Sequence, residues 1–231
     1  NYYGENAQEF PATGDFVMIN FNHAGDSQII RTLPRKSKFS RLDPIPGLGE
    51  QTVAANFDYV FILASLNKDF NIRRIERYLA LAWQSGAQPA VILTKADLVN
   101  DHSEHVRAVE EVAAGAGVYA VSSKTGLGLD LLSDYMKPGK TIVFLGSSGV
   151  GKSSLVNALA GKDVMAVGEI REDDSKGRHT TTHRQLIMLD SGVMIIDTPG
   201  MRELGMWDAA SGLEEAFGDV EQYFGECRFS D

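Results

Sequence analysis

The chain has 231 residues, of which 43% are hydrophobic and 23% are charged, and its formal net charge is -9. These values are typical of one large globular domain or two smaller ones, and the acidic excess argues against a protein that coats nucleic acid through overall positive charge. The single cysteine, Cys227, excludes an internal disulfide and predicts a reducing, cytoplasmic compartment. Apolar runs are of strand length, far below the roughly 20 residues that cross a bilayer, so we expect no membrane anchor.

Residues 1–45 are predicted to form a small β domain, with strands near 14–19 and 27–33 where apolar residues cluster beside turn residues. The end of this region contains five basic residues and no acidic one, and we call it the basic strip. It consists of Arg31, Arg35, Lys36, Lys38 and Arg41. Such a segment is either a solvated linker or a surface that contacts nucleic-acid phosphates.

From residue 59 onward, short apolar strands alternate with amphipathic helices, which predicts a parallel α/β sheet. The predicted strands are 59–64, 90–93, 118–121, 139–145, 185–189 and 193–196. The predicted helices are 71–85, 103–114 and one that includes 155–160.

The strongest motif lies between a predicted strand and a predicted helix and has the spacing of a P-loop. Its glycines allow backbone amides to turn toward phosphate oxygens, Lys152 would supply a positive charge to the β and γ phosphates, and the Ser153 hydroxyl would ligate magnesium. A glycine-rich turn without a ligand is the weaker interpretation, because this spacing seldom arises by chance. The predicted phosphate-binding set is Gly146, Ser147, Ser148, Gly149, Val150, Gly151, Lys152, Ser153 and Ser154.

Two segments that end other predicted strands predict a guanine pocket. In Thr94-Lys95-Ala96-Asp97, the carboxylate can accept from the ring N–H and the exocyclic amine of guanine, whereas adenine offers an acceptor where a donor is needed. Lys95 would lie along the ring plane. The segment Ser122-Ser123-Lys124-Thr125-Gly126 can present backbone N–H groups to the guanine carbonyl. The alternative for the first segment is a helix cap after a strand. The predicted base-binding set is Thr94, Lys95, Asp97, Ser122, Ser123 and Lys124.

The phosphate side has two further candidate segments. Asp197-Thr198-Pro199-Gly200 follows an apolar strand, so Asp197 would hold magnesium through water and the Gly200 amide would meet the γ phosphate. Thr181 or Thr182, in a polar segment between the P-loop and this strand, would close over magnesium. The alternatives are an ordinary turn that begins with aspartate and an ordinary edge strand.

The order of these motifs is unusual, because both base-reading segments precede the P-loop instead of following it. Together with Gly14-Asp15, residues 33–37, residues 50–58 and residues 177–182, the motifs resemble the bacterial ribosome small subunit-dependent GTPase A family, whose GTPase domain is circularly permuted. The resemblance covers nearly the whole chain. It departs from the family where Thr94 stands in place of a frequent asparagine.

The resemblance implies a fold class with three parts. These are a small all-β OB-fold domain over 1–45 that lacks its first strand, a circularly permuted α/β P-loop GTPase domain over 46–207, and the start of a C-terminal helical extension over 208–231. The extension binds zinc in the family, and here Cys227 is a possible first ligand of a site that this chain cannot complete. The implied cofactors are GTP or GDP with Mg²⁺.

Catalysis requires a residue that orients water, and Met201 occupies the position where many GTPases place a glutamine. His179 is the candidate substitute, and by resemblance it acts once the ribosome positions it. The predicted catalytic set is His179, Lys152, Thr181 and Thr182. Gly149 stands where some GTPases place an asparagine that recruits potassium, so we expect no potassium activation and slow hydrolysis by the isolated protein.

These observations favour a monomeric GTPase that acts in late maturation of the small ribosomal subunit, with ribosome-stimulated hydrolysis and with the basic strip at ribosomal RNA. The alternative is a GTP-dependent RNA- or ribosome-binding switch module with little hydrolysis of its own. A third possibility is a kinase that uses ATP.

Overall fold

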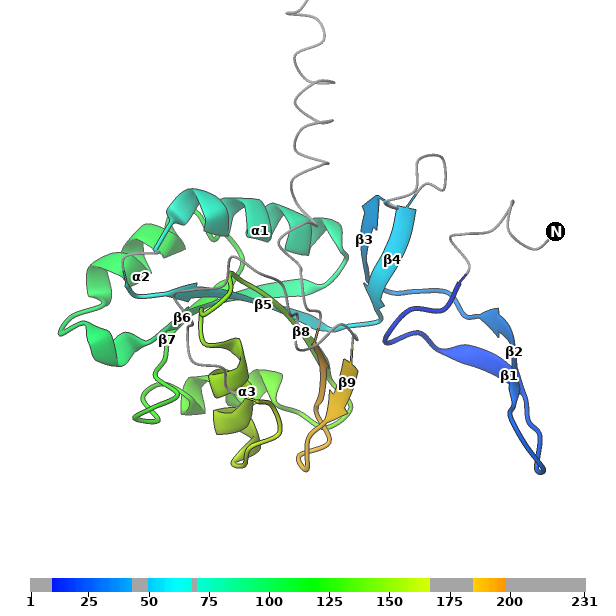
Figure 1. Cartoon of the computed structure of the whole chain (residues 1–231). Coiled ribbons are helices and arrows are strands. Elements are labelled where there is room, and N and C mark those ends of the chain that lie inside the picture. Colours follow the sequence, from blue (N-terminus) through cyan, green and yellow to red (C-terminus); the bar gives the residue numbers. More distant parts are fainter. Residues whose placement is uncertain (1–9, 43–49, 68–69, 167–184, 198–231) are drawn as a thin grey trace, which may run out of the picture.

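The computed structural model of the chain describes residues 10–42, 50–67, 70–166 and 185–197 (Figure 1). Its centre is a six-stranded sheet in the order β7-β6-β5-β8-β10-β9. All neighbouring pairs in this sheet are parallel except β9 with β10, which is antiparallel. The strands are β5 (Tyr59–Ser65), β6 (Gln88–Thr94), β7 (Gly117–Ala120), β8 (Thr141–Leu145), β9 (Gln185–Met188) and β10 (Met194–Asp197). Each lies within a few residues of its predicted range.

Helices cover both faces of this sheet, as the long apolar strands require. The helices α1 (Ile72–Gln84) and α2 (Ser103–Glu110) lie on one face, whereas α3 (Lys152–Ala160) and the 3-10 helix η3 (Asp130–Tyr135) lie on the other (Figure 1). Successive residues of β5 alternate between the two cores: Val60 and Ile62 pack with the α1 side, and Phe61 and Leu63 with the α3 side.

Two helices show how local chemistry sets the ends. The side chain of Asn71 caps α1 by accepting from the Arg74 amide at 3.0 Å. The predicted helix 103–114 is shorter in the structure, because α2 ends at Glu110 and the chain then forms turns. These turns include Gly115, whose φ of 79° is incompatible with a helix.

The N-terminal strands form two separate antiparallel pairs in the described part of the chain. They are β1 (Val17–Asn20) with β2 (Gln28–Thr32), and β3 (Lys38–Leu42) with β4 (Glu50–Ala55). The β1–β2 ribbon projects away from the sheet (Figure 1) and exposes apolar side chains. The predicted OB-fold, which lacks its first strand, therefore stays a prediction.

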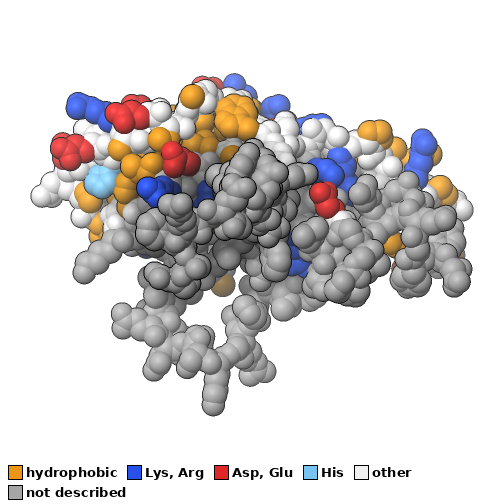
Figure 2. All heavy atoms as spheres, turned by 90° about the horizontal axis from the view of Figure 1, so that it is seen from above, with side chains coloured by type: hydrophobic (Ala, Val, Ile, Leu, Met, Phe, Trp, Pro, Cys, Tyr) orange, Lys and Arg blue, Asp and Glu red, His pale blue; other side chains and the backbone are white. Residues whose placement is uncertain are grey.

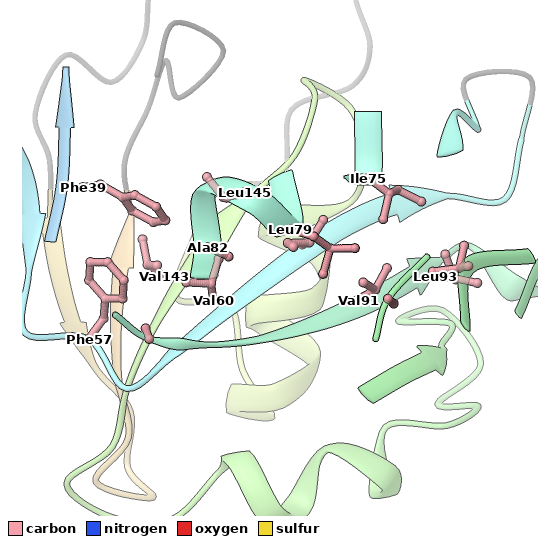
Figure 3. Close-up of a cluster of buried hydrophobic side chains, with 14 of the residues drawn as sticks. Phe39, Phe57, Val60, Ile75, Leu79, Ala82, Val91, Leu93, Val143 and Leu145 are labelled. Atoms are coloured by element: carbon pink, nitrogen blue, oxygen red, sulfur yellow. The ribbon is translucent and has the colours of Figure 1, made fainter. Parts of the chain in front are cut away.

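The β3–β4 pair packs against the same core as α1. Phe39 of β3 stacks on Phe57 with ring centroids 4.8 Å apart, and both lie beside Val143 of the central sheet (Figure 3). The predicted domain boundary at 45/46 falls between two strands that pair with each other. The division into domains also stays a prediction.

The face that carries α1 and α2 is seen in Figure 2, where basic, acidic and apolar side chains are interspersed. Neither sign of charge dominates the coloured side chains of this view. Among the residues described, no helix is long and apolar enough to cross a membrane.

Candidate functional site

The candidate site lies at the carboxyl ends of the parallel strands. In the sheet order, β6, β5, β8 and β10 are successive neighbours, and because the four strands are parallel their carboxyl ends lie at the same edge of the sheet. Ligands of open α/β sheets bind at this edge, where loops and helix N-termini converge. The topology therefore brings together the predicted motifs at 94–97, 146–153 and 197, in spite of their separation along the chain.

The P-loop connects β8 to α3, as predicted, and its shape depends on glycine at two positions. A Cβ on Gly146 would lie 3.1 Å from both the Leu63 carbonyl oxygen and Val150 Cγ1, so a side chain there would displace its neighbours. Gly151 has a φ of 102°, which a residue with a side chain rarely adopts, and α3 begins at the next residue, Lys152. The loop thus ends at a helix N-terminus, where backbone amides favour an anion.

Lys152 and Asp197 form an ion pair through Nζ and Oδ1. The lysine side chain is 29% exposed and that of the aspartate 10%. The pair is possible because β10 lies directly beside β8, so the end of one strand faces the helix that follows the other. The two charged groups predicted to bind phosphate and magnesium are therefore in direct contact.

The segment 94–97, which was predicted to read the base, is joined to the P-loop by two hydrogen bonds. The buried Thr94 hydroxyl donates to the Val150 carbonyl at 2.5 Å, and Lys95 Nζ donates to the Gly149 carbonyl at 2.8 Å. Lys95 has a φ of 60°, an uncommon conformation for a residue other than glycine. The Thr94 hydroxyl therefore connects this segment to the loop that precedes α3.

The same segment is fastened to the second base-reading segment. Ser122 Oγ donates to Asp97 Oδ1 at 2.7 Å, and the Ala96 amide donates to the Val121 carbonyl at 3.0 Å. The hydrogen bond from Ser122 lowers the pKa of the Asp97 carboxyl, against the opposing effect of burial, and Lys124 and Lys95 add a smaller lowering. Asp97 is therefore an ionised acceptor at neutral pH, as recognition of guanine requires.

The turn after the second base-reading segment contains a residue that sequence reasoning missed. Gly128 has a φ of 70°, and a Cβ there would lie 2.3 Å from the Ala120 carbonyl oxygen. The turn can return to the end of β7 only because this position is glycine. Two closely spaced glycines, Gly126 and Gly128, follow Thr125 in the sequence, and this spacing is the pattern that could have predicted the turn.

The described residues fit a guanine nucleotide with magnesium. Asp97, the P-loop, Lys152 and Asp197 are linked through a continuous series of contacts, and Ser153 and Ser154 lie in the first turn of α3. A structural zinc site needs about four ligands, and the sequence predicts only Cys227 as one of them. The described residues contain no group of three or more His, Cys, Asp or Glu side chains that could hold a metal.

Several predicted residues lie outside the described residues. They are His179, Thr181, Thr182, Gly200, Met201 and Cys227. Their predicted roles in water activation, magnesium binding, γ-phosphate contact and zinc binding stay predictions.

The basic strip is corrected by the structure at Arg35. The Arg35 guanidinium donates to both carboxylate oxygens of Asp15, at 2.8 and 2.7 Å, and to Thr52 Oγ1 at 2.9 Å. The side chains of Arg35 and Asp15 are only 14% and 1% exposed. The hydrogen bond that Arg35 donates to Asp15 raises the pKa of Arg35, in spite of burial. Arg35 was predicted to contact RNA because it has no acidic neighbour in the sequence, but its partner lies 20 residues earlier.

The other members of the strip also have partners. Lys36 pairs with Asp58 at 2.9 Å and Lys38 with Glu50 at 3.5 Å, and both lysine side chains are about half exposed. Arg31 Nε donates to Met18 Sδ at 2.9 Å, and Arg41 Nε to Gln51 at 3.1 Å. The strip therefore offers less unpaired positive charge than its sequence suggests.

We call the contacts around Asp15, Arg35, Asn56 and Asp58 the junction, because they join the β1–β2 ribbon to the central sheet. Asn56, with a φ of 56°, donates to the Gly14 carbonyl at 3.1 Å and accepts from the Lys36 amide at 3.0 Å. Gly14 fits against β4 so closely that a Cβ would lie 2.1 Å from the Ala55 carbonyl oxygen.

Asp58 joins the junction to the first residue of β8. Its carboxylate accepts from Lys36, from Lys140 at 3.2 Å and from the Thr141 amide at 2.9 Å. Burial raises the pKa of Asp58, but the hydrogen bonds from Lys36, Thr141 and Lys140 outweigh it and the net shift is downward.

Comparison with known proteins agrees with this geometry. The family model described as RsgA GTPase matches residues 32–207. The small ribosomal subunit biogenesis GTPase RsgA 1 of Listeria monocytogenes is 51% identical over 231 residues, which are 100% of this chain and 65% of that protein. The RsgA protein of Streptomyces avermitilis is 49% identical over 95% of this chain and 60% of its own length. The chain thus spans less than two thirds of these relatives.

Two solved structures are similar in fold. The crystal structure of YjeQ from Thermotoga maritima has a TM-score of 0.64 and 29% identity, covering 85% of this chain and 63% of that one. The structure of YloQ, a circularly permuted GTPase, has a TM-score of 0.59 and 28% identity, covering 95% of this chain and 68% of that one. The permuted order of the motifs is therefore shared with a solved structure.

Proposed function

Because the chain belongs to the RsgA GTPase family, we propose that it is a GTP phosphohydrolase that acts in the maturation of the small ribosomal subunit. The observation that carries the proposal is the pair of hydrogen bonds from Thr94 and Lys95 to the P-loop carbonyls of Val150 and Gly149. These bonds support a pocket in which the Asp97 carboxylate binds the base and the P-loop binds the phosphates of the same nucleotide. Adenine presents an acceptor at the ring nitrogen where guanine presents a donor, so an ionised carboxylate at this position favours guanine over the adenine of ATP.

In the proposed reaction, Asp97 binds the guanine edge, and the Lys152 ammonium and the P-loop amides bind the phosphates. Ser153 and Asp197 would hold magnesium, which supplies charge neutralisation at the β and γ phosphates when it is bound. We further propose that Thr181 or Thr182 contributes to the magnesium site, that the Gly200 amide contacts the γ phosphate, and that His179 orients the attacking water.

Nucleotide identity tests the first part of this proposal. Protein purified without added nucleotide is denatured and the released ligand is identified, and GDP and ADP are then compared in fluorescence competition. We expect GDP to bind at least about 100-fold more tightly than ADP, since a pocket that hydrogen-bonds a donor rejects an analogue that lacks it. Equal affinities would contradict the guanine assignment.

Turnover tests the second part. The rate of phosphate release is measured for the chain alone and with purified small ribosomal subunits, and in single turnover for His179→Ala. We expect slow release by the chain alone, a large acceleration by the subunits, and loss of that acceleration in the variant. Equal rates with and without subunits would leave a GTP-dependent binding module as the better description.

For the RNA contact we propose the exposed members of the basic strip, Arg31, Lys36 and Lys38, and no longer Arg35. The support is their exposure, about half for both lysine side chains. A charge reversal of Lys38 should weaken subunit binding and reduce its salt dependence, because one phosphate contact is lost. Lys162→Glu is the matched control, since Lys162 is equally exposed and pairs with Asp190. If both variants bound the small subunit equally well, the proposed RNA contact through the basic strip would be contradicted.

A further inference from the structure

The ion pair between Lys152 and Asp197 joins two groups that need different partners in the proposed reaction. Lys152 is the first residue of α3 and Asp197 the last residue of β10. The lysine must bind the nucleotide phosphates, and the carboxylate must bind magnesium through a water molecule. In the structure the lysine and the carboxylate instead form an ion pair with each other.

The surroundings of this pair favour exchange of partners. The Lys152 side chain is 29% exposed, so an incoming phosphate can reach its ammonium group, whereas Asp197 is 10% exposed and is held at the end of a strand. A largely buried carboxylate needs a counter-ion. Within the described ranges, Lys152 is the cation that pairs with it.

We propose that Asp197 is the counter-ion of Lys152 in the nucleotide-free protein and that nucleotide phosphate displaces it. The displacement releases the Asp197 carboxylate, which then takes magnesium as its new counter-ion. The inference rests on the proposed function, because it uses the same site. It adds that phosphate binding and magnesium binding are coupled through the exchange of this one lysine.

The proposal gives Asp197 opposite effects under two conditions. Without magnesium, the carboxylate competes with phosphate for Lys152 and weakens nucleotide binding. With magnesium, it holds the ion and strengthens nucleotide binding. A carboxylate that only holds magnesium, and that neither pairs with Lys152 nor repels the phosphates, would have no influence on nucleotide binding in the presence of a chelator.

The experiment is a titration of fluorescent GDP with the full chain and its Asp197→Asn variant, in EDTA and in magnesium. In EDTA we expect the variant to bind GDP about fivefold more tightly, the effect of removing one partly exposed competing ion pair. In magnesium we expect the variant to bind more weakly than the unaltered chain. Asp190→Asn is the matched control, because it removes the same charge from an exposed pair with Lys162, and it should change neither value.

A gain in EDTA could also arise from removal of direct repulsion between the carboxylate and the phosphates. The Asp197→Asn change is therefore repeated in a Lys152→Gln background. Exchange of partners predicts that the gain disappears there, because the lysine is absent, whereas direct repulsion predicts that it remains.

Urea unfolding of the unaltered chain, the Asp197→Asn and Lys152→Gln variants and the double variant, all without nucleotide, gives a second measurement. A coupling between the two substitutions in the free energy of unfolding supports the pair in the nucleotide-free protein, and additive effects contradict it. The proposal is overturned if Asp197→Asn leaves GDP affinity in EDTA unchanged, or if its gain persists in the Lys152→Gln background. Failure of the unaltered chain to prefer GDP over ADP would instead overturn the proposed function, so the two failures are distinct.

Discussion

The nucleotide site and the junction each depend on an ion pair, but the two pairs differ in burial and in the number of partners. Lys152 is 29% exposed and contacts Asp197 through a single oxygen. Arg35 is 14% exposed, contacts both oxygens of Asp15 and also donates to Thr52. In our proposal the Lys152–Asp197 pair must exchange partners when nucleotide binds, whereas the Arg35–Asp15 pair holds the ribbon in place and must not exchange.

The largest effect is expected at the nucleotide site. Lys152→Ala should weaken GDP binding about 1000-fold, because truncation of one member of a desolvated charge pair costs about 4 kcal/mol. Fluorescence titration measures the affinity, and Lys162→Ala serves as the control from an exposed pair. A loss of less than about tenfold would show that the ammonium does not meet the phosphates.

At the junction, the expected effect is on stability and not on binding. Asp15→Asn leaves the Arg35 guanidinium in a largely buried position without its counter-ion, so the free energy of unfolding should fall by about 3 kcal/mol. GDP affinity in the folded variant should change little. Urea unfolding checks this result against Glu50→Gln, whose pair with Lys38 is half exposed and is worth at most about 1 kcal/mol. If both variants lost the same free energy of unfolding, the Arg35–Asp15 pair would have no special role in stability.

The guanine preference should respond to Asp97 alone among nearby carboxylates. Asp97→Asn should weaken GDP binding about 30-fold, because a charge-assisted hydrogen bond to the base is lost. Xanthosine diphosphate should gain affinity for the same variant, since xanthine has a carbonyl where guanine has an amine. The control is Asp101→Asn, whose carboxylate accepts from the Ser103 amide at 2.9 Å. Similar losses in both variants would contradict the assignment of the base pocket.

The smallest effect is a pH dependence at Asp58. Its pKa is lowered in the folded protein, where hydrogen bonds from Lys36, Thr141 and Lys140 outweigh the opposing effect of burial. The stabilisation is therefore fully present above the ordinary aspartate pKa of about 3.9 and is lost as the pH falls through the lower folded value.

The Asp58→Asn variant tests this dependence. It should be less stable than the unaltered chain by about 1 kcal/mol at neutral pH, and the difference should shrink below about pH 4. Urea unfolding at several pH values measures the difference. Asp134→Asn, which alters a pair with Lys137 at 88% exposure of the aspartate, should show no such trend. A difference that grows in acid would contradict the lowered pKa.

Most of the central sheet could be predicted because its signals are local. The apolar run at 59–64 and the alternation of strands and helices identify β5 and its neighbours, and the glycine spacing places α3 directly after the P-loop. The gathering of the motifs at one edge also followed, since parallel strands end on the same side of a sheet.

The contacts that could not be predicted join residues far apart in the sequence. Arg35 and Asp15 are 20 residues apart, and Thr94 donates to a carbonyl 56 residues away. Charge counting along the sequence considers only near neighbours, so it assigned Arg35 to RNA. The pairing of β3 with β4 was missed because neither strand has a strong alternating pattern by itself.

The short connection between β4 and β5 has a mechanical consequence. Only residues 56–58 lie between them, and β5 has neighbours on both sides in the central sheet. Asn56 and Asp58 use their side chains to hold this connection in place. The β3–β4 pair and the central sheet therefore have little freedom to rotate against each other.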